Sequence, residues 1–201
     1  SIEAEKFLKY YFAAISEEFE DLCADQEEFI ELLMGSTEKM IRNDGNCSNQ
    51  EVFMKDFAEK MGLNDQAEAE KIKQRFEKFY QTKFTGLDQY FEIDRQTPAE
   101  IIEYLKKQGK RLILATNPLF PKEAIAARLS WAGIEAEDFE LLTHYENMSY
   151  AKPNPNYYQE ILNKIEAAPE DCLMIGNDLK EDAAASKLGI KTYIIEDQLI
   201  E

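Results

Sequence analysis

The feature that most constrains the fold is a change in hydrophobic pattern near residue 90. Before this point, apolar residues recur at the spacing of amphipathic helices, and no segment alternates with a period of two. After it, short apolar runs of strand length alternate with helical patterns. Strands that alternate with helices along a chain form parallel sheets that helices cover on both faces. The sequence therefore predicts a helical unit joined to an α/β unit.

The helical unit, predicted for residues 1–90, contains four helices. A turn signal at 43–46 separates the second helix from the third, and Ser48 and Glu51 have the spacing of a capping box at the start of the third. Each helix has an apolar stripe that is expected to pack into a common core. The stripes consist of Phe7, Tyr10, Tyr11 and Ala14; Phe29, Leu32, Leu33, Met40 and Ile41; Val52, Phe53, Phe57 and Met61; and Ile72, Phe76, Phe79 and Tyr80.

The second unit, residues 91–201, is predicted to be α/β, a doubly wound parallel sheet. Its first helix is expected to begin with a capping box at 97–100, to bury Ile101, Ile102 and Leu105, and to end at Gly109. The runs at 111–115, 172–175 and 191–195 are expected to be buried strands. The remaining elements are predicted to be a weaker strand at 139–143 and helices at 121–132, 155–165 and 180–188.

Composition limits the possible functions. The net charge of −17 opposes binding to nucleic acid or to an anionic membrane surface, although a few basic groups in one pocket can still bind a small anion. No apolar run approaches the roughly 20 residues that span a bilayer, and the acidic start at 1–5 is not a signal peptide. A cytoplasmic protein is expected. Cys23, Cys47 and Cys172 are too dispersed for a disulfide framework, and the single histidine, His144, is expected to be an ordinary loop residue.

Polar side chains follow three of the predicted strands, and ligands of parallel sheets bind beyond the carboxyl ends of the strands. A threonine hydroxyl and a neighbouring N–H can hold phosphate oxygens, a lysine supplies a compact positive charge, and oxygen-bearing side chains suit Mg²⁺. Taken singly, each residue is also compatible with a helix cap or a solvated side chain. Their common placement favours a site made of Thr116, Asn117, Lys152, Asn177, Asp178 and Asp182.

Three segments around these residues resemble a known family. LILATN is similar to the second motif of the haloacid dehalogenase (HAD) superfamily, YAKPNPNYY to the third, and MIGNDLKEDAAASKLGIKT to the fourth. The helical unit stands where this family inserts its C1-type cap, between motifs one and two. The resemblance implies a Rossmann-like HAD core with an all-helical C1-type cap, in the phosphatase-like branch of the superfamily.

The resemblance also implies a mechanism. An aspartate of motif one would attack phosphorus to form an aspartyl-phosphate, and a second aspartate would act as general acid and then base. Thr116 and the Asn117 N–H would bind the transferring phosphoryl group, and Lys152 would neutralise nucleophile and phosphate. Asp178, Asp182 or both would hold Mg²⁺. The implied activity is Mg²⁺-dependent hydrolysis of a small phosphorylated metabolite by a monomer or homodimer.

The sequence departs from the family pattern in two respects. It contains no motif-one segment, so the nucleophile and its strand are expected upstream of Ser1, the chain itself is expected to be inactive, and its end at Glu201 looks early. In motif four, Asn177 stands where many relatives have aspartate. Either Asn177 takes that ligand position or Asp178 ligates directly, and Asp182 is expected to be the main ligand.

Two other functions remain open. Asn177 is compatible with a metal-independent haloacid dehalogenase, and the lack of motif one is compatible with an inactive binding or regulatory protein. In the enzymatic interpretation the helical unit is expected to close over a small substrate. One hinge is expected at 84–94, which contains Gly86. Alternatively, the helices form a fixed dimerisation surface.

Overall fold

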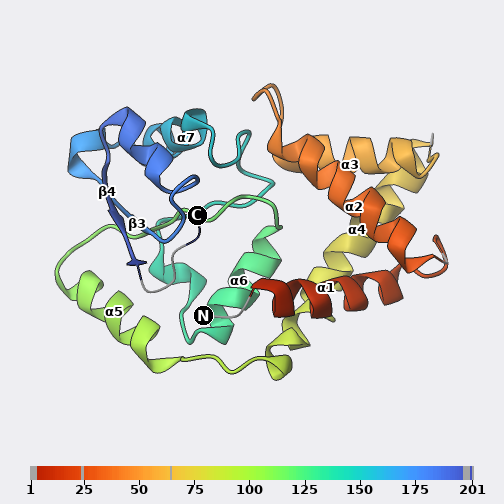
Figure 1. The fold of residues 1–201 in the computed structure, drawn as a ribbon, viewed down its shortest axis with the longest axis horizontal. Helices are drawn as coiled ribbons and strands as arrows, with labels where there is room; N and C mark the ends of the chain where they lie inside the picture. The colour runs from red at the N-terminus through yellow and green to blue at the C-terminus, as the bar shows by residue number, and fades with distance from the viewer. Residues whose placement is uncertain (1–3, 24, 64, 197–199, 201) are drawn as a thin grey trace.

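The computed structural model describes residues 4–23, 25–63, 65–196 and 200. Ser1 and Glu201 lie outside the described residues. These are the positions at which the sequence analysis expects an upstream motif and an early end of the chain. Figure 1 shows α1–α4 together at one end of the molecule, β3, β4 and α7 at the other, and α6 between them. The elements are α1 (Ala4–Glu18), α2 (Gln26–Ile41), α3 (Asn49–Lys60), α4 (Gln66–Gln81), η1 (Phe84–Tyr90), α5 (Gln96–Lys107), β1 (Ile113–Leu114), α6 (Lys122–Trp131), η2 (Ala136–Asp138), β2 (Leu141–Leu142), α7 (Pro155–Ile165), η3 (Pro169–Asp171), β3 (Leu173–Gly176), η4 (Ala183–Leu188) and β4 (Lys191–Ile194).

The four predicted helices are confirmed, and aromatic side chains fill the space between them. The ring of Phe76 on α4 lies 4.5 Å from that of Phe19, just after α1, and 5.3 Å from that of Phe57 on α3, measured between centroids. The capping box at the start of α3 is also confirmed, with the Ser48 side chain and the Glu51 side chain each accepting from the other's backbone N–H. Local sequence signals therefore define these helices well.

The hydrophobic core of the helices continues into α6. Trp131 of α6 is buried in the same cluster as Phe76, stacks on Phe84 at 5.3 Å, and donates its Nε1–H to the Thr85 carbonyl at 3.0 Å. Phe84 and Leu87 are buried as well. The segment expected to be a hinge begins with the 3₁₀ helix η1 and is packed against α6, because its apolar residues face the aromatic cluster.

The strands form two parallel pairs. β1 pairs with β2, and β3 pairs with β4. The expected single sheet is not seen among the described residues, where no strand lies between the two pairs, so β1 and β3 are each paired along one edge only. Both pairs contribute to the hydrophobic cluster around α7 and η4. The predicted strands at 111–115 and 139–143 are shorter than expected.

The prediction that the runs at 172–175 and 191–195 are buried is wrong for one face. Leu173 is 61% exposed, Ile175 52% and Tyr193 63%, whereas Met174 packs into the cluster around α7. Since side chains alternate between the faces of a strand, one face of this pair is covered by α7 and η4, and the described residues leave the other face open.

Two predicted helices differ from expectation. α5 begins at Gln96 rather than at a Thr97 cap, because the Asp94 carboxylate accepts the N–H groups of Gln96 and Thr97 at 2.9 and 3.1 Å. Ile101, expected to be buried, is 53% exposed. The helix predicted at 180–188 is the shorter 3₁₀ helix η4, preceded by turns. By contrast, α7 has the predicted bounds, and α6 lies within one residue at each end. Within the described chain, no helix is long and apolar enough to cross a membrane.

Candidate active site

The loop that follows β1 is fixed by side chains from β2 and α7. The carbonyl of Thr116 accepts hydrogen bonds from the hydroxyls of Thr143 at 2.7 Å and Tyr157 at 2.8 Å. Thr143 and Tyr157 are fully buried, and their hydroxyls also bond each other at 3.0 Å. This network holds the backbone of Thr116, the expected phosphate ligand, at the end of the strand.

Lys152 joins this loop to the end of β3. Its backbone N–H donates to the Asn117 side-chain oxygen at 3.2 Å, and its Nζ lies 2.6 Å from Asp182 Oδ1. Both members of this ion pair are 5% exposed. A buried ion pair persists only when further hydrogen bonds satisfy its members. The structure therefore brings together Asn117, Lys152 and Asp182, three of the candidate site residues.

Asp182 receives that further stabilisation from the turn after β3. Its Oδ2 accepts the backbone N–H groups of Asn177 at 3.0 Å and Asp178 at 3.1 Å. A Cβ at Gly176 would lie 2.0 Å from the same oxygen, so this close approach requires glycine. Asp182 thus fixes both the turn and Lys152, and its two oxygens accept three hydrogen bonds.

Asp178 has a more open position. It is half-buried, and its Oδ1 accepts the N–H groups of Lys180 at 2.8 Å and Glu181 at 2.6 Å. Its Oδ2 has no hydrogen-bond partner among the described residues. Asn177, also half-buried, precedes it in the same turn. This geometry favours Asp178 over Asp182 as a metal ligand, the reverse of the order expected from sequence.

Glu181 also lies at the candidate site, and sequence reasoning missed it. Its Oε1 accepts from the Asn117 amide at 2.8 Å, and its carbonyl accepts from the Tyr158 hydroxyl at 2.9 Å. Burial raises the pKa of Glu181, although the charge of Lys152 acts in the opposite direction. The only sequence signal was its position between two aspartates of motif four.

The described residues fit Mg²⁺ as part of a site. They contain no group of three His, Cys, Asp or Glu side chains that could hold a metal by itself. However, Mg²⁺ is commonly bound by one or two carboxylates together with substrate phosphate and water. Asp178, with the Asn177 amide beside it, supplies hard oxygen donors of this kind. His144 has its Nδ1 2.6 Å from Glu146 Oε2.

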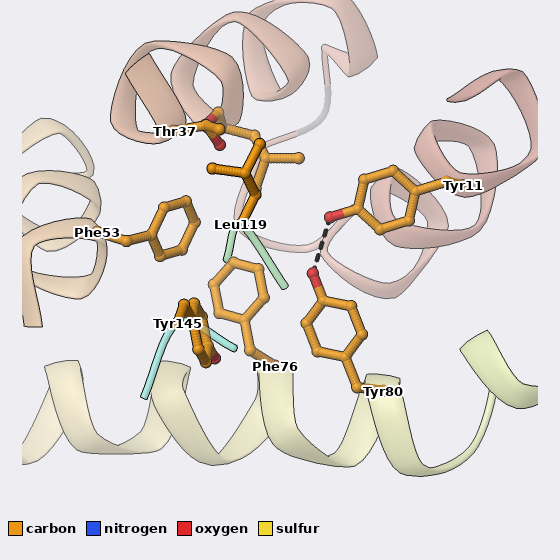
Figure 2. A pocket seen from close by; sticks show the side chains of 8 residues that line it. Tyr11, Thr37, Phe53, Phe76, Tyr80, Leu119 and Tyr145 are labelled. Atoms are coloured by element: carbon orange, nitrogen blue, oxygen red, sulfur yellow. Dashed lines mark hydrogen bonds between the residues drawn. The ribbon is translucent and has the colours of Figure 1, made fainter. Parts of the chain in front are cut away.

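A small cavity lies where the helical unit meets the loops after β1 and β2. Figure 2 shows Tyr11 of α1 and Tyr80 of α4 facing each other, with Leu119 and Tyr145 contributed by those two loops. The hydroxyls of Tyr11 and Tyr80 bond at 2.8 Å. The cavity volume is about 20 Å³, which is room for one water molecule rather than a substrate. The junction is therefore a packed contact.

A comparison with protein families identifies the class of protein that this fold and site define. Residues 3–189 match the model of the haloacid dehalogenase-like hydrolases, so the chain belongs to this family. The resemblance noted from the three motifs is confirmed at the level of the superfamily.

More specific relatives are distant. The pyrophosphatase PpaX of Bacillus cereus is 25% identical over 100 residues, which are 50% of this chain and 45% of the relative. The chain thus aligns with about half the length of the curated relatives it matches. The same identity and coverage hold for PpaX of Bacillus anthracis.

Solved structures confirm the fold. CbbY from Rhodobacter sphaeroides, in complex with phosphate, matches with a TM-score of 0.55 and 21% identity over 96% of this chain and 80% of that chain. A predicted phosphoglycolate phosphatase from Haemophilus somnus 129PT matches with a TM-score of 0.52 and 18% identity, over 93% of this chain and 78% of that chain. An L-2-haloacid dehalogenase from Xanthobacter autotrophicus matches with a TM-score of 0.51 and 11% identity, over 92% of this chain and 71% of that chain. At these identities the similarity concerns the fold alone.

Proposed function

We propose that the protein is a Mg²⁺-dependent phosphatase that hydrolyses a small phosphorylated metabolite through an aspartyl-phosphate. The observation that carries this proposal is the buried pair of Lys152 and Asp182, which joins the loop after β1 to the turn after β3. The ion pair fixes the Lys152 side chain at the strand ends. The names of PpaX, a pyrophosphatase, and of the Haemophilus somnus neighbour, a predicted phosphoglycolate phosphatase, support the same reaction class.

Each site residue has a role in this proposal. The Thr116 hydroxyl and the Asn117 N–H bind oxygens of the transferring phosphoryl group, and Lys152 offsets the negative charge of nucleophile and phosphate. Asp182 holds Lys152 in place. Phosphoryl transfer depends mainly on such positioning and charge stabilisation.

Asp178, assisted by Asn177, is the proposed protein ligand of Mg²⁺. The bound metal would neutralise charge on the phosphate oxygens. Asp182 is the less suitable ligand, because Lys152 and two backbone N–H groups already occupy its oxygens.

We further propose that the nucleophile lies on an additional parallel strand between β1 and β3. These strands each have one edge without a backbone partner among the described residues, and both pack on the cluster around α7. The end of an inserted strand would lie between Thr116 and Asp178. A carboxylate there attacks phosphorus, the P–O bond to the leaving group breaks, and a second carboxylic acid protonates the departing oxygen. Water then cleaves the acyl phosphate to regenerate the carboxylate.

The experiment is a panel of phosphorylated metabolites tested on the full-length protein with and without Mg²⁺. Release of phosphate that depends on Mg²⁺ is expected. Lys152→Ala should lower kcat on the order of a hundredfold, because it removes the charge aimed at the transferring group. Lys187→Ala removes an exposed lysine of η4 and serves as the matched control. Halide release from 2-haloacids without metal would instead show a dehalogenase, and no turnover of either class would favour a binding protein.

The proposed substrate is small because residues 1–90 form the proposed C1-type cap over the site. The net charge of −17 also repels large polyanions at long range, while a pocket with Lys152 and Mg²⁺ accepts one phosphate. Sugar phosphates and nucleotides should therefore have higher kcat/KM than a phosphopeptide. A phosphopeptide that exceeds them by a wide margin would contradict the cap proposal.

A further inference from the structure

We propose that Asn49 is a positioning residue that latches the helical unit onto the chain segment leading to Lys152. This inference rests on the proposed role of Lys152 in phosphate binding. The segment in question, residues 145–151, connects the loop after β2 with Lys152. The start of α3, more than 90 residues earlier in the sequence, contacts it directly.

The first N–H groups of α3 are bonded outside their own helix. The first residues of a helix have N–H groups with no partner within it. Here the N–H of Asn49 donates to the Met148 carbonyl at 2.9 Å, and the N–H of Gln50 donates to the Tyr145 carbonyl at 2.8 Å. The segment before Lys152 thus completes the N-terminus of a helix in the other unit.

The Asn49 side chain adds a third bond across the same contact. Its Nδ2 donates to the Tyr150 carbonyl at 3.3 Å, and its Oδ1 accepts from Asn43 Nδ2 at 2.9 Å. The bond from Asn43 fixes which end of the amide points toward Tyr150. Asn49 is fully buried, so neither bond is exchanged for water without moving the two units apart.

The turn before α3 approaches the same segment closely. Gly45 has a φ of +90°, and a Cβ at this position would lie 2.1 Å from the Tyr150 hydroxyl oxygen. Any other residue would be strained by the backbone conformation and would push against the Tyr150 ring. The turn that contains Gly45 therefore packs directly against the Tyr150 side chain.

The latch and the site act on opposite ends of one short segment. Met148, Ala151 and Lys152 are all buried, so the segment has little freedom to absorb a displacement. At one end it bonds α3, and at the other Lys152 bonds Asn117 and Asp182. Release of the latch therefore changes the position of Lys152 as well as that of the helical unit.

Two variants of the full-length protein test the latch. Asn49→Asp keeps an acceptor for Asn43 but loses the donor to Tyr150, whereas Gly45→Ala displaces the turn without changing Asn49. Asn46→Ala is the matched control, since Asn46 lies in the same turn, is exposed, and among the described residues has hydrogen bonds to Asp44 alone. Amide exchange, KM for the best substrate and the inhibition constant for orthophosphate are measured for each.

Both latch variants should raise KM and the orthophosphate inhibition constant together, by about three- to tenfold, the effect of one lost hydrogen bond. They should also speed amide exchange at 49–50. The control should match wild type.

If thermal stability falls while the orthophosphate inhibition constant is unchanged, Asn49 is merely structural and the proposal is overturned. If wild type hydrolyses no phosphate ester, the proposed function fails. In that case, orthophosphate binding that is equal in wild type and Asn49→Asp would overturn the latch as well.

Discussion

Asp178 and Asp182 differ in surroundings although they lie four residues apart. Asp182 is buried with Lys152, and Asp178 is half-buried with one unpartnered oxygen among the described atoms. Asp182→Asn leaves the Lys152 charge unpaired and should destabilise the fold by about 3–5 kcal/mol. Asp178→Asn should destabilise it much less and should raise the Mg²⁺ concentration needed for half-maximal activity.

Urea unfolding and Mg²⁺ titration of both variants measure these two effects separately. Lys187→Ala again provides the baseline. If the two variants are equally stable, or if Asp182→Asn raises the required Mg²⁺ concentration more than Asp178→Asn does, Asp182 is the main ligand, as the sequence analysis expects.

Glu181 predicts a dependence of stability on pH. Because burial raises its pKa in the folded protein, the native state retains its proton to higher pH than the unfolded chain. The stability associated with the protonated form is complete below the ordinary pKa of 4.5 and is lost as pH rises through the raised value.

Glu181→Gln keeps an acceptor for Asn117 and avoids this loss of stability. The variant should be more stable than wild type at pH 7 and equal to it near pH 4, as measured by urea unfolding. A variant that is less stable at pH 7 would contradict the assignment.

Sequence reasoning pointed to the candidate site residues that belong to motifs and missed the residues whose contacts are defined by distant partners. Thr116, Lys152 and Asp182 stand after short apolar runs, where a parallel sheet places its ligands. Asn49 and Glu181 have no such signal, since their partners Tyr150 and Asn117 are 101 and 64 residues away. Only the folded chain brings these pairs together.

Among the elements, helices were predicted better than strands, for a physical reason. α7 shows its apolar residues at a helical period and has a proline at its first turn, so its bounds follow from local sequence. The burial of β3 depends instead on what packs on each face. The same run of apolar residues includes Met174, which is packed, and Leu173, which is exposed.

The pairing of β1 with β2 predicts a specific sensitivity at Thr143. Each strand is two residues long, and the Thr143 hydroxyl links the pair because it lies within hydrogen-bonding distance of the Leu114 and Thr116 carbonyls and of the Tyr157 hydroxyl. Thr143→Val conserves shape but removes this buried hydroxyl. It should destabilise the fold by about 1–3 kcal/mol. Urea unfolding checks this value, with the exposed Thr85→Val as the control. A cost below that of the control would show that the network adds nothing.

At the scale of the whole molecule, the helical unit and α6 share one hydrophobic cluster. Phe76 of α4 and Trp131 of α6 both belong to it, although they lie on opposite sides of the boundary near residue 90. Packing that crosses the boundary couples the two parts, because loss of one removes the partner surface of the other. The chain is therefore expected to unfold in a single cooperative transition.

Phe76→Ala tests this coupling. Phe76 is almost fully buried among aromatic rings, so truncation should destabilise the protein by about 3–5 kcal/mol. Trp131 is the only tryptophan, and its fluorescence reports on α6, whereas far-UV circular dichroism is dominated by the helices. Both signals should shift to the same lower urea midpoint, while Leu8→Ala, at an exposed position of α1, should leave both nearly unchanged. If the circular dichroism midpoint falls and the Trp131 midpoint stays at the wild-type value, the helical unit and the α/β unit fold independently, and the shared cluster does not couple them.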